Sequence, residues 1–216
     1  MPQPSNHTNS AAILLFLKAP RGGYVKTRLA HSTGPERALK AYRALVERQW
    51  AELPHHDRIE VHYTPNDADF EMRQWLGHEH EFYAQAVGEL GVRLEHSVEQ
   101  AFERGAKSVF CIGGDCPKLD QLHFEQATAA LQEDCDVVFG PTEDGGYYLI
   151  GLNAPQPELF QDIPWSSRNT LDASLQKAAS LGLRVKLLEM LYDIDEVTEL
   201  QRAIADGRLS AKIMEH

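Results

Sequence analysis

Short β-rich runs alternate with longer stretches of helical periodicity along most of the chain, and this alternation limits the possible folds more than any other feature. The runs expected to form strands are Ala12–Leu17, Ile59–Tyr63, Glu81–Gln85, Ser108–Ile112, Asp136–Phe139, Tyr147–Gly151 and Arg184–Leu188. Apolar residues recur at helical spacing over Glu36–Leu53, Asp67–Leu76, Val92–Arg104, Gln121–Gln132, Asn169–Ser180 and Glu196–Ala205. This pattern predicts an α/β fold, a three-layer sandwich with a mainly parallel sheet between helices.

The sixth expected strand, Tyr147–Gly151, follows the fifth too closely for a helical crossover. Because parallel neighbours need such a crossover, at least one strand is expected to run antiparallel or to be offset. The 216 residues contain no repeat and no linker rich in Gly, Pro or Ser. We therefore expect a single domain over residues 11–216, preceded by a loose polar tail at residues 1–10.

The composition excludes several classes of protein. The formal net charge of −11 argues against a broad electrostatic grip on nucleic acid. No apolar run approaches the roughly 20 residues of a spanning helix, and the first ten residues lack the order of a secretory signal. We therefore expect a cytoplasmic protein with no nucleic-acid or membrane partner. Any anionic ligand must be met by a local basic patch.

One such patch follows the first expected strand, over Lys18–Leu29. Gly22 and Gly23 allow the backbone to approach a ligand closely, and four cations surround them. A P-loop is disfavoured because Val25 stands where that motif needs glycine. The alternative is a solvated basic loop. On the first interpretation, the phosphate-binding candidates are Lys18, Gly22, Gly23, Lys26 and Arg28.

Two aspartates from distant segments are candidate metal ligands. Asp115 leaves an apolar run after two glycines, and it would either bind a hard cation such as Mg²⁺ or Mn²⁺ or cap the next helix. Asp195 is placed to cap the final helix. Asp193 has no such duty, so it is the better second ligand. Two carboxylates would leave coordination positions open for phosphate oxygens and water.

The turn Asp144-Gly145-Gly146 has two interpretations. Asp-Gly-Gly is common hairpin chemistry. At the same sheet edge as Asp115 it would instead hold an acceptor, with Asp144 as a hydrogen-bond acceptor or general base. Trp165 would flank the acceptor pocket or belong to the core.

Six separated motifs together carry a resemblance to a known superfamily: FLKAPRGGYVKTRLA, QAVGELGVRLEHSVEQAF, IGGDCPKL, GPTEDGGYYLIGL, IPWSSRNTL and YDIDEVTEL. Their order resembles that of the nucleotide-diphospho-sugar transferases, which have the GT-A-like fold. Within them the chain is most similar to the bacterial family called selenodomain-associated transferase 1, or arsenosugar biosynthesis glycosyltransferase. It is more distantly similar to 2-phospholactate guanylyltransferase and the molybdenum cofactor guanylyltransferases. The resemblance extends from about Ala11 to Ala205.

The resemblance implies roles for residues at matching positions. It implies that Lys18, Lys26 and Arg28 contact phosphates and that Asp115 and Asp193 bind the metal. It also implies that the segment Gln85–Arg93 meets the base or ribose, through Gln85, Gly88, Gly91 and Arg93. One departure is that the DxD signature of glycosyltransferases is reduced here to Gly113-Gly114-Asp115.

The expected activity is metal-dependent transfer of a sugar from a nucleoside diphosphate sugar to a small acceptor, with Mg²⁺ or Mn²⁺ as cofactor. Lys26 and the metal would neutralise the leaving group, and Asp115, Asp144 and Lys26 are the catalytic candidates. A second hypothesis is nucleotidyl transfer from an NTP to a small phosphate or carboxylate acceptor. A third is a nucleotide-binding protein without activity. The expected partners are the nucleotide donor and the acceptor, and a homodimer remains open.

Overall fold

The computed structural model describes residues 11–54 and 57–215. The predicted tail at residues 1–10 lies outside the described residues. A single sheet of seven strands crosses the molecule in the order β3-β2-β1-β4-β6-β5-β7. The strands are β1 (Ala12–Lys18), β2 (Arg58–Thr64), β3 (Glu81–Ala84), β4 (Val109–Gly113), β5 (Val137–Pro141), β6 (Tyr147–Leu152) and β7 (Val185–Leu187).

Strand β6 is the antiparallel member of the sheet. It pairs antiparallel with both β4 and β5, whereas β1 pairs parallel with β2 and β4, and β5 pairs parallel with β7. The prediction of one antiparallel strand at Tyr147–Gly151 is therefore confirmed. As a result the carboxyl ends of β1, β4, β5 and β7 all lie at one edge, beside the amino end of β6.

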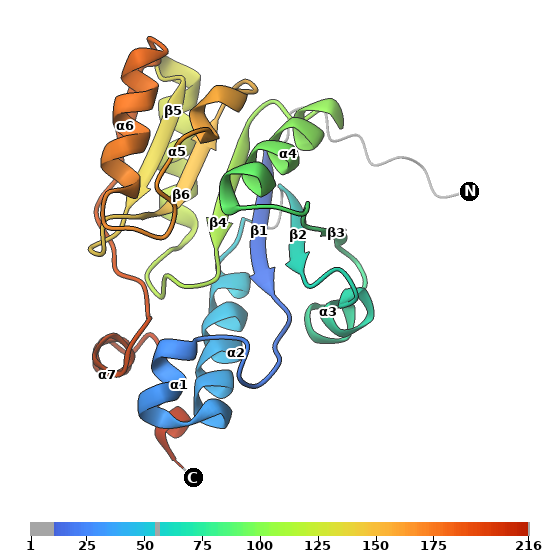
Figure 1. The fold of residues 1–216 in the computed structure, drawn as a ribbon, viewed down its shortest axis with the longest axis vertical. Helices are drawn as coiled ribbons and strands as arrows, with labels where there is room; N and C mark the ends of the chain where they lie inside the picture. The colour runs from blue at the N-terminus through green and yellow to red at the C-terminus, as the bar shows by residue number, and fades with distance from the viewer. Residues whose placement is uncertain (1–10, 55–56, 216) are drawn as a thin grey trace.

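Helices cover both faces of this sheet (Figure 1). They are α1 (Thr27–Thr33), α2 (Pro35–Ala51), α3 (Asp69–Leu76), α4 (Leu90–Glu103), α5 (Gln121–Glu133), α6 (Thr170–Ser180) and α7 (Val197–Ala205), with 3₁₀ turns η1 (Pro157–Phe160) and η2 (Ala211–Met214). None of the described helices has both the length and the apolar character needed to cross a bilayer.

Alternate residues of β1 divide the core between the two faces. Ile13, Leu15 and Leu17 join a cluster that includes residues of α2, α3 and α5, and Ala12 and Leu14 join one that includes residues of α4 and α6. Each of these side chains is at most 2% exposed, as expected for a central parallel strand buried on both faces. A third cluster packs α1 and α7 against α2 below the sheet edge.

Candidate functional site

Two adjoining cavities open at the carboxyl edge of the sheet. The larger has a volume of about 550 Å³ and the smaller about 420 Å³. Residues from both ends of the sequence form the wall that they share: Phe16, Lys18, Arg28, Leu90, Gly113, Asp115, Ser166 and Asp195. In open α/β sheets this edge is the usual place for a ligand.

The loop after β4 presents Asp115 to both cavities. Gln49 of α2 is buried, and its Nε2 donates to the carbonyl of Gly113 over 2.7 Å. Gly114 has no room for a side chain, since an added Cβ would lie 2.7 Å from Leu17 and 2.9 Å from Val46. The loop is therefore packed tightly onto the core. Helix α5 takes its N-cap from Asp120, so Asp115 does not act as the cap of that helix.

The segment carrying Asp193 lies directly against the Asp115 loop. The backbone N–H of Ile194 donates to the carbonyl of Asp115 over 3.0 Å. Both aspartates line the larger cavity. The structure thus brings together two acids that are 78 positions apart in the sequence (193 − 115).

Lys26 forms the ionic contact at the centre of the site. Its Nζ lies 2.6 Å from Asp115 Oδ1 and 3.5 Å from Asp195 Oδ1, and its side chain is only 5% exposed. Burial lowers the pKa of Lys26, but Asp115 and then Asp195 and Asp193 raise it, and the net direction is upward. Lys26 therefore stays charged. Its φ of 47° is rare for a residue other than glycine, and such backbone strain gathers at functional sites.

Asp195 belongs to this charged cluster, and its predicted role as the N-cap of the last helix is wrong. The N-cap of α7 is Glu196, whose N–H is bonded by Glu199 Oε2 at 2.9 Å in a capping box. Asp195 instead contacts Lys26, and its Oδ2 lies 3.2 Å from Arg28. A capping box centred one residue later frees Asp195 to pair with the basic loop.

Asp193 is the electrostatically costly member of the cluster. Its Oδ1 is buried and has no hydrogen-bond partner among the described residues. Burial is the main cause that raises the pKa of Asp193 to about 8; Asp115 raises it further, and Lys26 opposes the shift. An unpaired buried carboxylate is energetically unfavourable, so this group tends to keep its proton in the folded chain.

The turn between β5 and β6 presents Asp144 to the larger cavity. Asp144 Oδ1 accepts hydrogen bonds from Thr142 Oγ1 at 2.5 Å and from the Gly146 N–H at 3.0 Å. One carboxylate oxygen thus holds the hairpin, as the turn interpretation expected. Neither of these bonds uses Oδ2. Both interpretations of this turn are compatible with the geometry.

Gly145 fixes this turn to the loop before α6. It has a φ of +91°, and an added Cβ would overlap the carbonyl group of Arg168. The Leu171 N–H also donates to the Gly145 carbonyl over 2.9 Å. Gly145 is therefore a packing residue. Gly146 lines the larger cavity, and Gly145 does not.

Gly145→Ala should lower the free energy of unfolding by about 3 kcal/mol, because it combines an unfavourable backbone conformation with a backbone clash. The matched control is Gly182→Ala, at a φ of +70° with nothing within 4 Å of the added Cβ. That variant should lose only about 1 kcal/mol. Urea unfolding measures both, and equal losses would contradict the packing role of Gly145.

Only part of the segment that was expected to meet the base lines a cavity. Gln85 and Arg93 line the smaller cavity, and Arg93 Nη1 lies 3.4 Å from Gln85 Oε1. Gly91 lies inside α4, where an added Cβ would contact the Trp165 ring and the carbonyl of Phe160. Gly91 is thus explained by close packing. Helix α4 begins at Leu90, earlier than the predicted Val92.

Five of the predicted glycines do not line either cavity: Gly22, Gly23, Gly88, Gly91 and Gly145. Gly22 and Gly23 are exposed and belong to the turn before α1, a short helix that the sequence pattern did not predict. The phosphate-binding candidates with side chains in the cavity walls are Lys18, Lys26 and Arg28. The role of all these residues remains a prediction.

Aromatic residues form part of the larger cavity, and periodicity did not identify most of them. Trp165 lines the cavity and also packs on Gly91 and edge-on to Tyr147 at a centroid distance of 6.3 Å, so its position is compatible with both of its interpretations. Phe16 and Tyr147 also line it. Phe16 lies near the end of β1 and Tyr147 lies at the start of β6. These positions could have identified both residues from the sequence, because strand ends at this edge of the sheet face the site.

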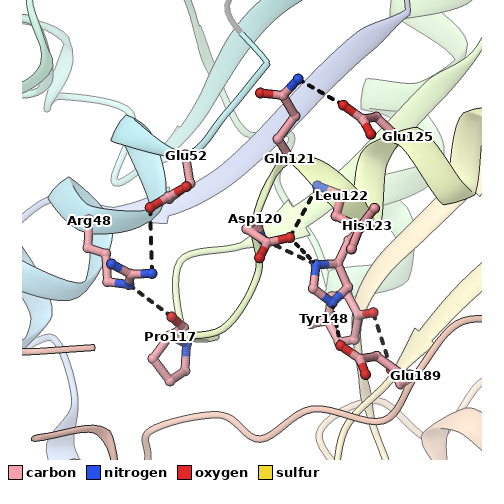
Figure 2. Close-up of polar contacts among 10 residues, drawn as sticks. All are labelled: Arg48, Glu52, Pro117, Asp120, Gln121, Leu122, His123, Glu125, Tyr148 and Glu189. Carbon is pink, nitrogen blue, oxygen red and sulfur yellow. Dashed lines mark hydrogen bonds and ion pairs between the residues drawn. The ribbon is translucent and has the colours of Figure 1, made fainter. Parts of the chain in front are cut away.

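A buried histidine ties the two acidic segments together (Figure 2). His123 is 4% exposed; its Nδ1 lies 2.7 Å from Asp120 and its Nε2 lies 3.0 Å from Glu189. Tyr148 donates from its hydroxyl to the Glu189 carbonyl over 3.2 Å, and its ring packs edge-on to His123. His123 therefore joins the start of α5 to the segment that leads to Asp193.

His123→Ala should lower the free energy of unfolding by about 2–3 kcal/mol, because it opens a cavity and removes two polar contacts. His96→Ala, at an exposed position of α4, serves as the control and should change it by less than about 0.5 kcal/mol. Guanidinium unfolding distinguishes the two. Equal stability of both variants would show that the histidine bridge contributes nothing.

A family model describes part of this chain. Residues 48–167 match the family DUF2064, described as an uncharacterized protein conserved in bacteria. No protein of curated function matches the sequence.

Solved structures match over almost the whole length. One is a protein of Desulfovibrio desulfuricans G20 that is provisionally named a nucleotide-diphospho-sugar transferase, with 32% identity, a TM-score of 0.87 and coverage of 94% of this chain and 90% of that one. CMP:2-keto-3-deoxy-manno-octonic acid synthetase, solved with CTP, has 12% identity, a TM-score of 0.58 and coverage of 92% and 98%. Glucosyl-3-phosphoglycerate synthase from Mycobacterium tuberculosis, solved with Mn²⁺ and UDP, has 10% identity, a TM-score of 0.53 and coverage of 93% and 77%. The last two show the GT-A-like fold alone.

Proposed function

The chain belongs to the DUF2064 family, and we propose that it is a metal-dependent transferase that moves a sugar from a nucleoside diphosphate sugar to a small acceptor. The observation that carries the proposal is the meeting of Asp115, Asp193 and Lys26 at the carboxyl edge of the sheet, where two cavities adjoin. Two observations support a transferase of this kind: the name of the Desulfovibrio protein, and the fold that this chain shares with more distantly similar structures.

The donor set fits a hard divalent cation. Asp115 and Asp193 offer carboxylate oxygens, and the unpartnered Oδ1 of Asp193 is the kind of group that a cation satisfies. No group of three or more His, Cys, Asp or Glu side chains suited to a metal occurs in the part of the chain that the structure describes. Donor phosphates and water would therefore complete the coordination. Mg²⁺ or Mn²⁺ bound there would supply electrostatic stabilisation of the phosphates.

The basic residues would hold the donor's diphosphate. Lys18 and Arg28 line both cavities, and Lys26 stands between Asp115 and Asp195. Negative charge grows on the diphosphate as the bond to the sugar breaks, so fixed cations there favour the transition state over the ground state. The smaller cavity, with Gln85 and Arg93, would take the nucleoside.

The larger cavity would take the sugar and the acceptor. Asp144 stands in its wall, held by Thr142 and the Gly146 N–H through one oxygen. Its other oxygen would accept the proton of the attacking hydroxyl, or a hydrogen bond that orients it. Trp165 and Tyr147 would cover the apolar face of a sugar ring.

Nucleotidyl transfer is the second candidate, since the same cations would hold the pyrophosphate released from an NTP. The fold shared with a synthetase solved with CTP supports it. The third hypothesis, a binding protein without activity, predicts loss of the charged groups. Lys26, Arg28, Asp115 and Asp193 are all present and lie together, so it is disfavoured.

A thermal-shift panel separates these functions. The full chain is tested with UDP-, GDP-, ADP- and dTDP-sugars and with the four NTPs, each with and without Mn²⁺ or Mg²⁺. A ligand bound by the native state raises the melting temperature. A metal-dependent rise with one nucleotide sugar supports glycosyl transfer, and a rise with NTPs alone supports nucleotidyl transfer. No rise with any nucleotide would contradict both.

A further inference from the structure

Arg168 is an exposed arginine in the wall of the larger cavity. Arg21, Arg184 and Arg202 are each held by a carboxylate. Arg168 has no ion pair or side-chain hydrogen bond among the described residues, although the chain carries 32 acidic and 21 basic residues. Other cations such as Arg208 also have no carboxylate contact among the described residues, so the feature that distinguishes Arg168 is its place in the wall of the larger cavity.

The backbone that carries Arg168 is held firmly. Its carbonyl packs against Gly145, and the next turn is tied to the same glycine through the Leu171 N–H. Thr170 Oγ1 donates to the carbonyl of Pro164 over 2.8 Å, and Ser167 Oγ donates to the same carbonyl over 2.8 Å. Arg168 thus projects from a rigid base, which lowers the entropy lost when it binds a ligand.

The charges of the two cavities form an ordered pattern. Lys18 and Arg28 line the wall that the two cavities share, together with Asp115 and Asp195, whereas Asp144 and Asp193 line only the larger cavity. Arg168 lines the larger cavity but not the smaller one, so it stands apart from the side proposed for the nucleoside. The larger cavity therefore has a cation of its own, beyond those proposed for the donor's diphosphate.

We propose that Arg168 binds a phosphate or carboxylate group of the acceptor, so that the acceptor is a small anionic alcohol. This inference rests on the proposed function, since it assigns the acceptor to the larger cavity. A guanidinium matches a phosphate or carboxylate through two parallel hydrogen bonds. An anionic acceptor bound there would have its hydroxyl within the cavity that also contains Asp144.

The test compares three probes that share one carbon skeleton: glycerol 3-phosphate, glycerate and glycerol. Their affinities for the full chain are measured by calorimetry, alone and with saturating Mn²⁺ and the nucleoside diphosphate that stabilises the protein most. Glycerol 3-phosphate or glycerate should bind, and glycerol should not. Arg168→Gln should weaken the anionic probe about 10- to 100-fold, as expected for loss of a charge-assisted pair. Arg168→Lys should restore part of that loss.

Arg208→Gln is the control, because Arg208 lies outside both cavities and its loss changes the net charge equally. It should leave the affinity for every probe unchanged. Equal affinities in wild type and Arg168→Gln, or binding of none of the anionic probes by wild type, would overturn the proposal. Nucleotide binding is recorded on the same samples, so failure of Arg168 with intact nucleotide binding is distinct from failure of the proposed function.

Discussion

Replacing Asp115 by asparagine should lower the rate of transfer at least about 1000-fold while leaving the fold intact. A single polar or charged group that stabilises the charge developing in the transition state typically contributes a factor of about 10²–10³ to the reaction rate. Here the same substitution removes a metal ligand and the carboxylate that lies 2.6 Å from Lys26. The metal-dependent part of the thermal shift with the best donor should vanish with the activity.

The control for this experiment is Asp172→Asn, an exposed aspartate in the first turn of α6 that lines neither cavity. It changes the net charge by the same amount and should keep full activity. Circular dichroism and the melting temperature without ligand show whether each variant is folded. A folded Asp115→Asn protein with an unchanged metal-dependent shift would remove Asp115 from the site.

Asp193→Asn should make the metal-free protein more stable, by up to roughly 5 kcal/mol above pH 8, because each pH unit between the folded and unfolded pKa values is worth about 1.4 kcal/mol. The pKa of Asp193 is raised to about 8 in the folded chain, against an ordinary value of about 3.9 in the unfolded one. Between these values the unfolded chain releases a proton that the folded chain keeps, so wild-type stability falls as pH rises through that window. Asparagine never ionises and avoids the loss. The gain should therefore be absent near pH 4 and level off above pH 8.

The measurement is urea unfolding in EDTA at pH 4.5, 7 and 9, for wild type and Asp193→Asn. The stabilised variant should also lose the metal-dependent nucleotide shift, which would link the cost of the buried acid to its proposed use. Asp172→Asn again provides the comparison at an exposed position. A stability difference that does not change with pH would mean that Asp193 is not held protonated in the folded protein.

The order of strands and helices was readable from the sequence because the buried strands are nearly continuous apolar runs. Tyr147–Gly151 was predicted as antiparallel from the short connection before it, and β6 has that orientation. Helix α1 was missed because its seven residues follow a glycine-containing basic turn and provide too few turns for a periodic signal. The fold class followed from local patterns alone.

The candidate site was only partly readable, because its geometry depends on contacts between remote segments. The Asp115 and Asp193 segments were identified from their positions after strands, but the bond from Ile194 to Asp115 is a tertiary contact with no local signal. Asp195 was misassigned since two consecutive residues are suitable caps, and tertiary pairing with Lys26 decided between them. Gly91 was given a ligand role that close packing against Trp165 explains.

The anomalous signal of a crystal soaked with Mn²⁺ and the stabilising nucleoside diphosphate would show whether Asp115 and Asp193 bind one cation. One manganese peak should lie about 2.1–2.3 Å from carboxylate oxygens of both Asp115 and Asp193, with diphosphate oxygens on the side of Lys26 and Arg28. A peak elsewhere, or nucleotide bound without metal between these two aspartates, would contradict the proposed metal site.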